Sequence, residues 1–244
     1  MDTLQAIYTR KTIRKFSEKD VEWDKVVEIL DAGRNAPSAG NLQPAKFIVV
    51  TDQEKKRELA DASLQQWWME AAPVLIVVAA DLERVKQFYG PRGVELYSIQ
   101  DCAAAMQNMI LAATDLGIGT AWVSAFDEKM VYRAMDIPED TARPLSILCL
   151  GYSSEEPKEQ IKFPLTTAVF LEKWGNRVRD PLRMYLGQYS HIWESKIDNG
   201  IKAMQSATEA VREKIKEFGK KFLSKSEKPE PEKELAGPLH KKKK

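Results

Sequence analysis

Four basic side chains gather within six positions near the start of the chain. Arg10, Lys11, Arg14 and Lys15 surround the hydroxyl group of Thr12. Arginine presents a planar fork of donors and lysine a compact point charge, and both groups bind phosphate oxygens. The hydroxyl group adds one more donor. This stretch therefore predicts a binding site for a phosphate group or a similar anion.

A second stretch, residues 34–44, reads Arg-Asn-Ala-Pro-Ser-Ala-Gly-Asn-Leu-Gln-Pro. It has too many turn-forming residues for a regular helix or strand, and too few charged residues for a loop that only faces solvent. Its backbone N–H groups and short side chains suit close contact with a flat ligand that forms hydrogen bonds, and Pro37 and Pro44 stiffen both ends. The alternative is an ordinary helix-to-strand connection, because loops of this composition are common.

Together and in this order, residues 10–16 and 36–44 resemble the FMN-binding signature of the nitroreductase-like flavoprotein family. The resemblance runs from about residue 4 to residue 174. It implies an α+β fold of three layers, in which helices flank a mixed, mostly antiparallel sheet. It also implies an FMN-dependent NAD(P)H oxidoreductase that reduces nitroaromatic, quinone or related small-molecule acceptors in a ping-pong cycle through flavin N5. Relatives of this kind are homodimers with FMN at the interface.

The same resemblance gives roles to particular residues. The residues expected at the phosphate group of FMN are Arg10, Lys11, Thr12 and Arg14, assisted by Lys162. Those expected along the ribityl chain and the edge of the isoalloxazine ring are Pro37, Ser38, Asn41 and Gln43, with Gln66 as a further polar contact. The backbone N–H groups of Ser124 and Ala125 are expected near flavin N5 and O4, where they stabilise charge on the reduced ring. No side chain is required as acid or base, and no metal is expected.

This chain departs from the family pattern at two of these positions. Many relatives have glycine where this chain has Ala125, which keeps the backbone donor but narrows the space beside it. Arginine is commoner than lysine at the position of Lys162, so a bidentate contact is not expected there. A solvated loop lysine is the alternative role for Lys162.

Composition limits the other classes of function. The chain has 244 residues, 43% of them hydrophobic, and a net charge of +1, so no global field attracts nucleic acid. Cys102 and Cys149 lie in apolar surroundings, which predicts buried thiols in a reducing compartment. The longest apolar run, residues 71–80, is too short to span a bilayer, and the N-terminus has no apolar signal sequence. We therefore expect a cytoplasmic protein.

Hydrophobic periodicity and turn residues predict the elements that position these residues. Helices are expected at residues 2–9, 23–32, 52–68, 97–116 and 127–135, and strands at 47–51, 73–80, 120–125 and 145–152. A loop is expected around residues 90–93, with Phe88 and Tyr89 as an anchor for it or as part of a lid. Trp67 and Trp68 are expected to pack in the core or to form a wall beside a ligand.

The resemblance fades after residue 176, so we divide the chain into an FMN-binding domain (1–176), a helical extension (177–225) and a disordered charged tail (226–244). Apolar residues recur at heptad spacing over about four repeats from Ile197 to Phe222. This pattern indicates a long amphipathic helix lying on its own domain or on a partner subunit, or a coiled coil. A helix lying on a membrane surface is a minority interpretation, because acidic residues are mixed into it.

Three other functions stay open at this level. The same fold carries other flavin chemistry, such as reductive dehalogenation or flavin fragmentation. A flavin-binding scaffold or regulatory protein acting through its C-terminal helix is a second alternative. A nucleic-acid-associated protein using the basic tail is a third, and the near-neutral net charge counts against it.

Overall fold

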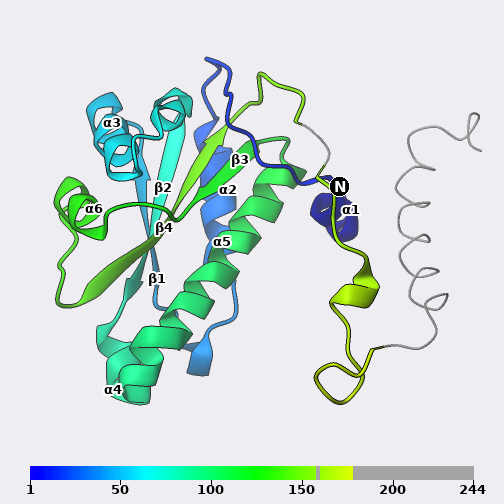
Figure 1. Ribbon diagram of the computed structural model, residues 1–244. Helices are drawn as coiled ribbons and strands as arrows, with labels where there is room; N and C mark the ends of the chain where they lie inside the picture. Colours follow the sequence, from blue (N-terminus) through cyan, green and yellow to red (C-terminus); the bar gives the residue numbers. More distant parts are fainter. Residues whose placement is uncertain (158–159, 178–244) are drawn as a thin grey trace, which may run out of the picture. The chain divides into compact units, whose positions relative to one another are not determined.

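The computed structural model describes residues 1–157 and 160–177 of the chain (Figure 1). The chain divides into two compact units, residues 1–162 and 163–244, and each is described by itself. In the second unit, a short 3-10 helix, Leu165–Thr167, precedes a bridge between Phe170 and Arg177. Apart from Arg177, the helical extension expected at residues 177–225 and the tail at 226–244 lie outside the described residues, and the boundary expected at residue 176 stays a prediction.

The first unit is built on a four-stranded sheet. Its strands are β1 (Ala45–Val50), β2 (Val74–Asp81), β3 (Gly119–Val123) and β4 (Ala142–Gly151), in the order β1-β2-β4-β3. All three pairings are antiparallel. A single isolated bridge, between Thr12 and Thr120, is parallel. The sheet expected from the family resemblance is thus present, and its described strands are antiparallel throughout.

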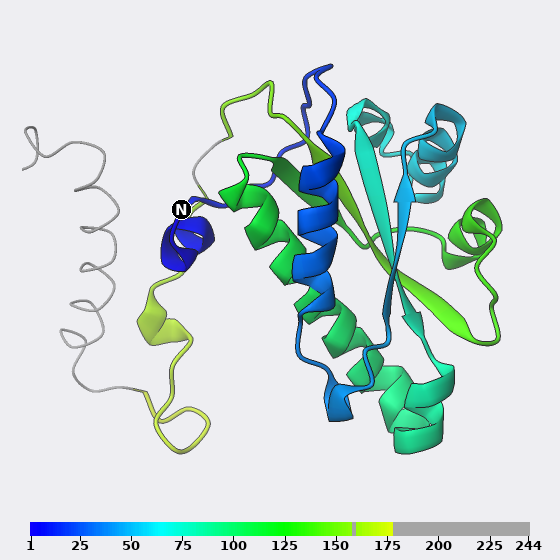
Figure 2. The ribbon, with the colours of Figure 1, turned by 180° about the vertical axis from the view of Figure 1, so that it is seen from behind.

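Helices cover both faces of this sheet (Figures 1 and 2). On one face lie α2 (Trp23–Arg34) and α5 (Ser98–Asp115), and on the other lie α3 (Gln53–Ala62) and α6 (Glu128–Met135). Alternate residues of β2 point to the two faces, so Ile76 joins the α2 and α5 side and Val77 the α3 and α6 side. The expected three-layer α+β architecture is confirmed.

Both cysteines are free and buried, one in each hydrophobic cluster. Cys102 of α5 packs with the α2 side of the sheet, and Cys149 of β4 packs with the α3 side. The prediction of buried thiols is confirmed. Among the described residues, no helix combines the length and apolar character needed to cross a membrane.

The helix expected at residues 52–68 is shorter than predicted. α3 ends at Ala62, and a turn follows in which Leu64 and Gln65 both have positive φ. Two consecutive residues in the left-handed region end a right-handed helix. The backbone N–H of Gln66 closes this turn on the carbonyl oxygen of Ala60 at 3.1 Å, before the 3-10 helix Trp67–Ala71 begins.

The loop expected around residues 90–93 is helical instead. α4 (Glu83–Arg92) runs into a π-type turn (Gly93–Tyr97), which continues directly into α5. Gly90 keeps the predicted break, because its φ of 57° and ψ of −148° kink α4 there. Tyr89 packs edge-on against Tyr97 with ring centroids 5.1 Å apart, which supports its role as an anchor, whereas Phe88 is exposed.

The N-terminal helix α1 (Thr3–Thr9) begins as predicted, because the carboxylate of Asp2 accepts a hydrogen bond from the backbone N–H of Gln5 at 2.8 Å. The N-terminal amine pairs with Asp115 at 2.6 Å. Leu4 and Ile7 leave an apolar surface of α1 about half exposed. Just after the end of α5, Gly117 adopts the expected left-handed conformation, with φ of 73°.

Gly151 provides a test of the packing at the end of β4. A methyl group at this position would lie 2.6 Å from Cδ of Pro73 and 2.7 Å from Cδ1 of Phe16, both on rigid rings. We expect Gly151→Ala to lower the free energy of unfolding by about 1–3 kcal/mol, because overpacking forces the rings apart. Denaturant unfolding measures this change. Glu28→Ala, on the exposed side of α2, is the control and should change the stability by less than about 0.5 kcal/mol; equal stability of the two variants would contradict the packing described here.

Candidate functional site

Residues 10–16, here called the basic segment, lie against the ends of β3 and β4. The backbone N–H of Ile13 donates to the carbonyl oxygen of Thr120 at 2.8 Å, and Phe16 forms a bridge with Ser153. Ile13 and Phe16 are buried, while Arg14 and Lys15 between them are exposed. Two apolar anchors thus fasten the backbone and direct the basic side chains outward.

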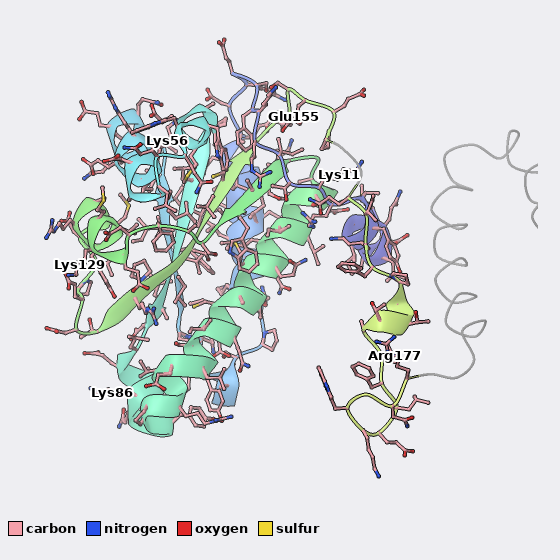
Figure 3. All side chains as sticks on the ribbon, in the orientation of Figure 1. Lys11, Lys56, Lys86, Lys129, Glu155 and Arg177 are labelled. Atoms are coloured by element: carbon pink, nitrogen blue, oxygen red, sulfur yellow. The ribbon has the colours of Figure 1, made fainter. Side chains whose placement is uncertain are left out.

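Glu155 holds the same segment from its other side. One carboxylate oxygen, Oε1, accepts hydrogen bonds from the backbone N–H groups of Arg14 at 2.8 Å and Lys15 at 3.1 Å. These two bonds, with that from Arg14 the larger cause, hold the pKa of Glu155 below its ordinary value. The amine of Lys11 donates to the carbonyl oxygen of Pro157 at 3.4 Å, and Figure 3 shows Lys11 and Glu155 at the same end of the sheet.

The basic side chains are available to an external anion. Within the described residues, none of the side chains of Arg10, Lys11, Arg14 and Lys15 forms an ion pair with a carboxylate. The guanidinium group of Arg14 lies over the ring of Trp68, with its carbon 5.8 Å from the ring centroid. Basic side chains that form no ion pair among the described residues fit a phosphate group better than they fit an internal salt-bridge network.

The segment around Trp68 combines packing with exposure. Trp68 packs on the α3 side of the core, whereas Trp67 is 47% exposed. The side-chain amide of Gln66 donates to the carbonyl oxygen of Ser63 at 2.9 Å, so one of its two N–H donors is used within its own turn. Its second N–H and its amide oxygen are left for a contact with a ligand.

Ser124 and Ala125 directly follow β3, and both are exposed. The basic segment is joined to the same strand at Thr120, and four residues of extended chain span about 13 Å. β3 thus places these two backbone donors on the side of the molecule that carries the basic segment. The indole N–H of Trp122 donates to Oγ of Ser124 at 2.7 Å, which fixes the seryl side chain.

The stretch that contains the other predicted residues, 36–44, is here called the polar loop. Gly40, Asn41 and Gln43 all have positive φ, between 52° and 55°. Oγ of Ser38 accepts a hydrogen bond from the backbone N–H of Gln43 at 3.0 Å, and the side-chain amide of Gln43 donates to Oδ1 of Asn41 at 3.2 Å. The loop is therefore tightly folded on itself, in a conformation that only a specific set of contacts can maintain.

Tyr89 of α4 closes over the polar loop at Gly40. A methyl group added to Gly40 would lie 2.5 Å from the hydroxyl oxygen of Tyr89. The positive φ of Gly40 favours glycine, and the close approach of the Tyr89 hydroxyl leaves no space for a side chain at this position.

A cavity of about 600 Å³ opens beside the polar loop. Its lining includes Pro37, Ser38 and Gln43 of the loop, together with residues of α2 and α5. Its volume lies in the range of small-molecule sites. The wall contributed by α5 includes Asp101, which sequence analysis did not identify; the available signal was a carboxylate within a helix that is otherwise apolar or small at most positions.

The structure separates the predicted residues into two half-sites. The basic segment, which contacts Trp68 through Arg14 and β3 at Thr120, precedes α2, and the polar loop follows the opposite end of α2 (Figure 2). A helix of the length of α2 spans about 18 Å. Within one chain, residues 10–14 and 37–43 therefore lie on segments that flank opposite ends of α2.

Lys162 belongs to neither half-site by any direct contact. Its side chain is exposed, and its amine donates to Oε1 of Gln160 at 3.4 Å. Its expected part in phosphate binding stays a prediction.

Known proteins resemble this chain over the region that carries both half-sites. The sequence model of the Nitroreductase family matches residues 7–71 and 64–152. A Methanothermobacter thermautotrophicus protein with the provisional name NADH dehydrogenase/NAD(P)H nitroreductase is 34% identical over 180 residues, which cover 71% of this chain and 88% of that protein. A Bacillus subtilis protein named FMN reductase (NAD(P)H) is 24% identical over 201 residues, covering 77% and 80%. Among solved structures, an FMN-dependent nitroreductase from Clostridium difficile R20291 matches with a TM-score of 0.61 and 27% identity, covering 70% of this chain and 99% of that one.

The contact of Glu155 with the basic segment predicts a pH dependence. Because the pKa of Glu155 is lowered by folding, its contribution to stability is complete above the ordinary value of 4.5 and is lost as the pH falls through the lowered value. We expect Glu155→Ala to have a lower Tm than the wild type at neutral pH, and the difference to shrink below about pH 4.5. Thermal unfolding monitored by circular dichroism between pH 7 and pH 3 measures both melting points.

Glu156→Ala is the matched control, because it removes a neighbouring exposed carboxylate. It should leave the Tm close to that of the wild type throughout the same pH range. A difference for Glu155→Ala that stayed constant down to pH 3 would show that the ionised carboxylate does not hold the segment.

Proposed function

The chain belongs to the nitroreductase family, and on that premise we propose that it is an FMN-dependent oxidoreductase that takes electrons from NAD(P)H and passes them to small organic acceptors such as nitroaromatic compounds or quinones. The observation that carries this proposal is the basic segment, which is fastened beside β3 and whose cationic side chains form no ion pair with a carboxylate among the described residues. The buried free thiols fit the reducing cytoplasm that we propose as its compartment.

The residues present fit FMN as a ligand. Arg10, Lys11 and Arg14, with Thr12, would hold its phosphate group through charge-assisted hydrogen bonds. When bound, FMN supplies the two-electron chemistry at its N5 atom, which accepts electrons from one substrate and gives them to the next. The backbone N–H groups of Ser124 and Ala125 would offset negative charge on the ring system. Since these groups take up or release no proton, the protein's part is binding, orientation and electrostatic stabilisation.

We propose a ping-pong order of substrates at this site. The oxidised nicotinamide leaves before the acceptor enters, so a single binding face serves both. The exposed position of Ser124 and Ala125 leaves one side of the site open to solvent in the single chain, where each substrate would approach in turn.

The separation of the half-sites supports a homodimer in which each site is shared. The basic segment of one subunit and the polar loop of the other would meet at the interface, and twofold symmetry would create two equal sites. The first unit leaves apolar side chains exposed on two helices that such an interface would cover: Leu4 and Ile7 of α1, and Trp23 and Val27 of α2.

The cofactor proposal predicts a flavin spectrum. The purified protein, supplied with FMN, should absorb near ~450 nm and should bleach when NADH or NADPH is added without oxygen. We expect Arg10→Ala combined with Arg14→Ala to weaken FMN binding by at least about 100-fold, because two charge-assisted hydrogen bonds are lost. Equilibrium dialysis, with absorbance as the readout, measures the dissociation constant.

A matched control removes two basic side chains elsewhere. Lys86 and Lys129 are exposed and lie apart from the basic segment (Figure 3), so Lys86→Ala with Lys129→Ala should leave FMN affinity unchanged. A protein that gains no flavin spectrum would overturn the cofactor proposal. Unaltered affinity in the double arginine variant would overturn only the phosphate assignment.

The shared site predicts complementation between subunits. A segment variant (Arg10→Ala and Arg14→Ala) and a loop variant (Ser38→Ala and Asn41→Ala) should each bind little FMN as homodimers. In a heterodimer of the two, one site is intact and the other carries both defects, so we expect about half the FMN of the wild-type dimer. Co-expression with two affinity tags and sequential purification isolates the heterodimer, and absorbance gives its FMN content. A heterodimer without FMN would exclude the shared site.

A further inference from the structure

The polar loop has a conformation that its own sequence does not favour. Asn41 and Gln43 adopt positive φ although neither is glycine, and such positions cost on the order of 1–3 kcal/mol each. The hydrogen bonds of Ser38 and Gln43 lie within the loop and offset part of this cost. A contact from outside the loop would stabilise this shape further.

Asp101 provides such a contact from α5. Its Oδ1 accepts a hydrogen bond from the backbone N–H of Ala39 at 3.0 Å, across 62 positions of sequence. Ala39 opens the short 3-10 turn that contains Gly40 and Asn41, so this bond acts where the loop begins to curl. Because α5 is a long helix packed on the sheet, it offers a rigid support for the loop.

The position of Asp101 is not explained by its own helix. An acidic residue in the first turn usually interacts with free N–H groups at a helix start. Here α5 continues directly from the π-type turn Gly93–Tyr97, and the backbone N–H of Ser98 already donates to the carbonyl oxygen of Gly93. The contact with Ala39 is thus the hydrogen bond that the described structure gives this carboxyl group.

Burying the carboxyl group of Asp101 costs free energy. The residue is 8% exposed, and its second oxygen, Oδ2, has no hydrogen-bond partner within the described structure. Burial raises the pKa of the carboxyl group, and the Ala39 N–H opposes that shift. A hydrophobic residue would fill this place in the cavity wall at lower energetic cost. The carboxyl group is therefore better explained by the loop than by the core.

We propose that Asp101 is a positioning residue that, through the N–H group of Ala39, holds the polar loop in the shape with which it completes the flavin site of the partner subunit. This inference rests on the proposed function, because it assigns Asp101 to the half of the shared site that serves the other subunit. What the loop needs from Asp101 is an acceptor oxygen at Oδ1, and a neutral amide supplies one as well as a carboxylate does.

The two sides of this hydrogen bond can be removed separately. Asp101→Leu removes the acceptor and replaces the carboxyl group with an apolar side chain that branches at the same atom. Ala39→Pro removes the donor and leaves Asp101 intact; proline is tolerated at the first position of a helix, and the extended backbone of Ser38 is compatible with a following proline. Asp101→Asn keeps an acceptor oxygen.

We expect Asp101→Leu and Ala39→Pro to weaken FMN binding by about tenfold each, as for one hydrogen bond with an unpaired buried partner left behind. The double variant should be no weaker than either single one, because both changes remove the same bond. Asp101→Asn should bind FMN within about twofold of the wild type. Equilibrium dialysis gives the dissociation constants, and thermal unfolding checks that each variant is folded.

Heterodimers then show which half-site Asp101 serves. At an FMN concentration near the wild-type dissociation constant, Asp101→Leu paired with the segment variant (Arg10→Ala and Arg14→Ala) should hold about half the wild-type FMN. Paired with the loop variant (Ser38→Ala and Asn41→Ala), it should hold almost none. Ala39→Pro should behave in the same way, which keeps the test decisive if Asp101→Leu does not fold.

Any one of the following results would overturn the inference: wild-type affinity in both Asp101→Leu and Ala39→Pro, additive losses in the double variant, or rescue by the loop variant instead of the segment variant. Failure of Asp101→Asn to retain binding would also overturn it, because the acceptor oxygen alone would then be insufficient. The pairing of segment and loop variants serves as the reference. If that pair fails to complement, the shared site itself is wrong, and the failure concerns the proposed function.

Discussion

The structure depends on one constraint, the burial of β2 on both of its faces. Seven of its eight residues are buried, so neither face of the sheet at this strand can meet water. Two helical layers are therefore required, and the chain supplies α2 and α5 for one face and α3 and α6 for the other. Covering a strand in this way stabilises the fold through apolar area removed from water. The positions of these helices also determine where the connecting segments lie, and these segments include the basic segment and the polar loop.

The two half-sites follow from this layering. The basic segment enters beside β3 and leads into α2, and the polar loop leaves the far end of the same helix before β1 begins. A helix that must cover a sheet face cannot be shortened without exposing that face. The distance between the half-sites is thus set by the core, and a shared site in a symmetric dimer accommodates it. The polar loop is held by a tyrosine and a carboxylate from the neighbouring helices α4 and α5.

The sequence predicted the main elements well because they are long or strongly patterned. The continuous apolar runs that became β2 and α5 left few alternatives. The helix at residues 52–68 was overextended because Leu64 and Gln65 show no turn signal in their residue types, and the loop at 90–93 was misjudged because Gly90 kinks a helix without ending it. The motifs identified the residues of both half-sites but not their separation. The sequence analysis missed Asp101 because its hydrogen-bond partner lies 62 positions away, and no local pattern of residues indicates such a contact.

The burial of the two thiols has a practical consequence for studying this fold. Burial raises the pKa of Cys102 to about 12 and raises that of Cys149 further from neutrality, so neither sulfur is a reactive thiolate in the folded chain. Cys102 lies on α5 against one face of the sheet, and Cys149 lies on β4 and faces the α3 side. Alkylation of each cysteine therefore requires the chain to open at its own layer. The rates at which the two thiols are alkylated would therefore report separately on the opening of the two sides of the sheet.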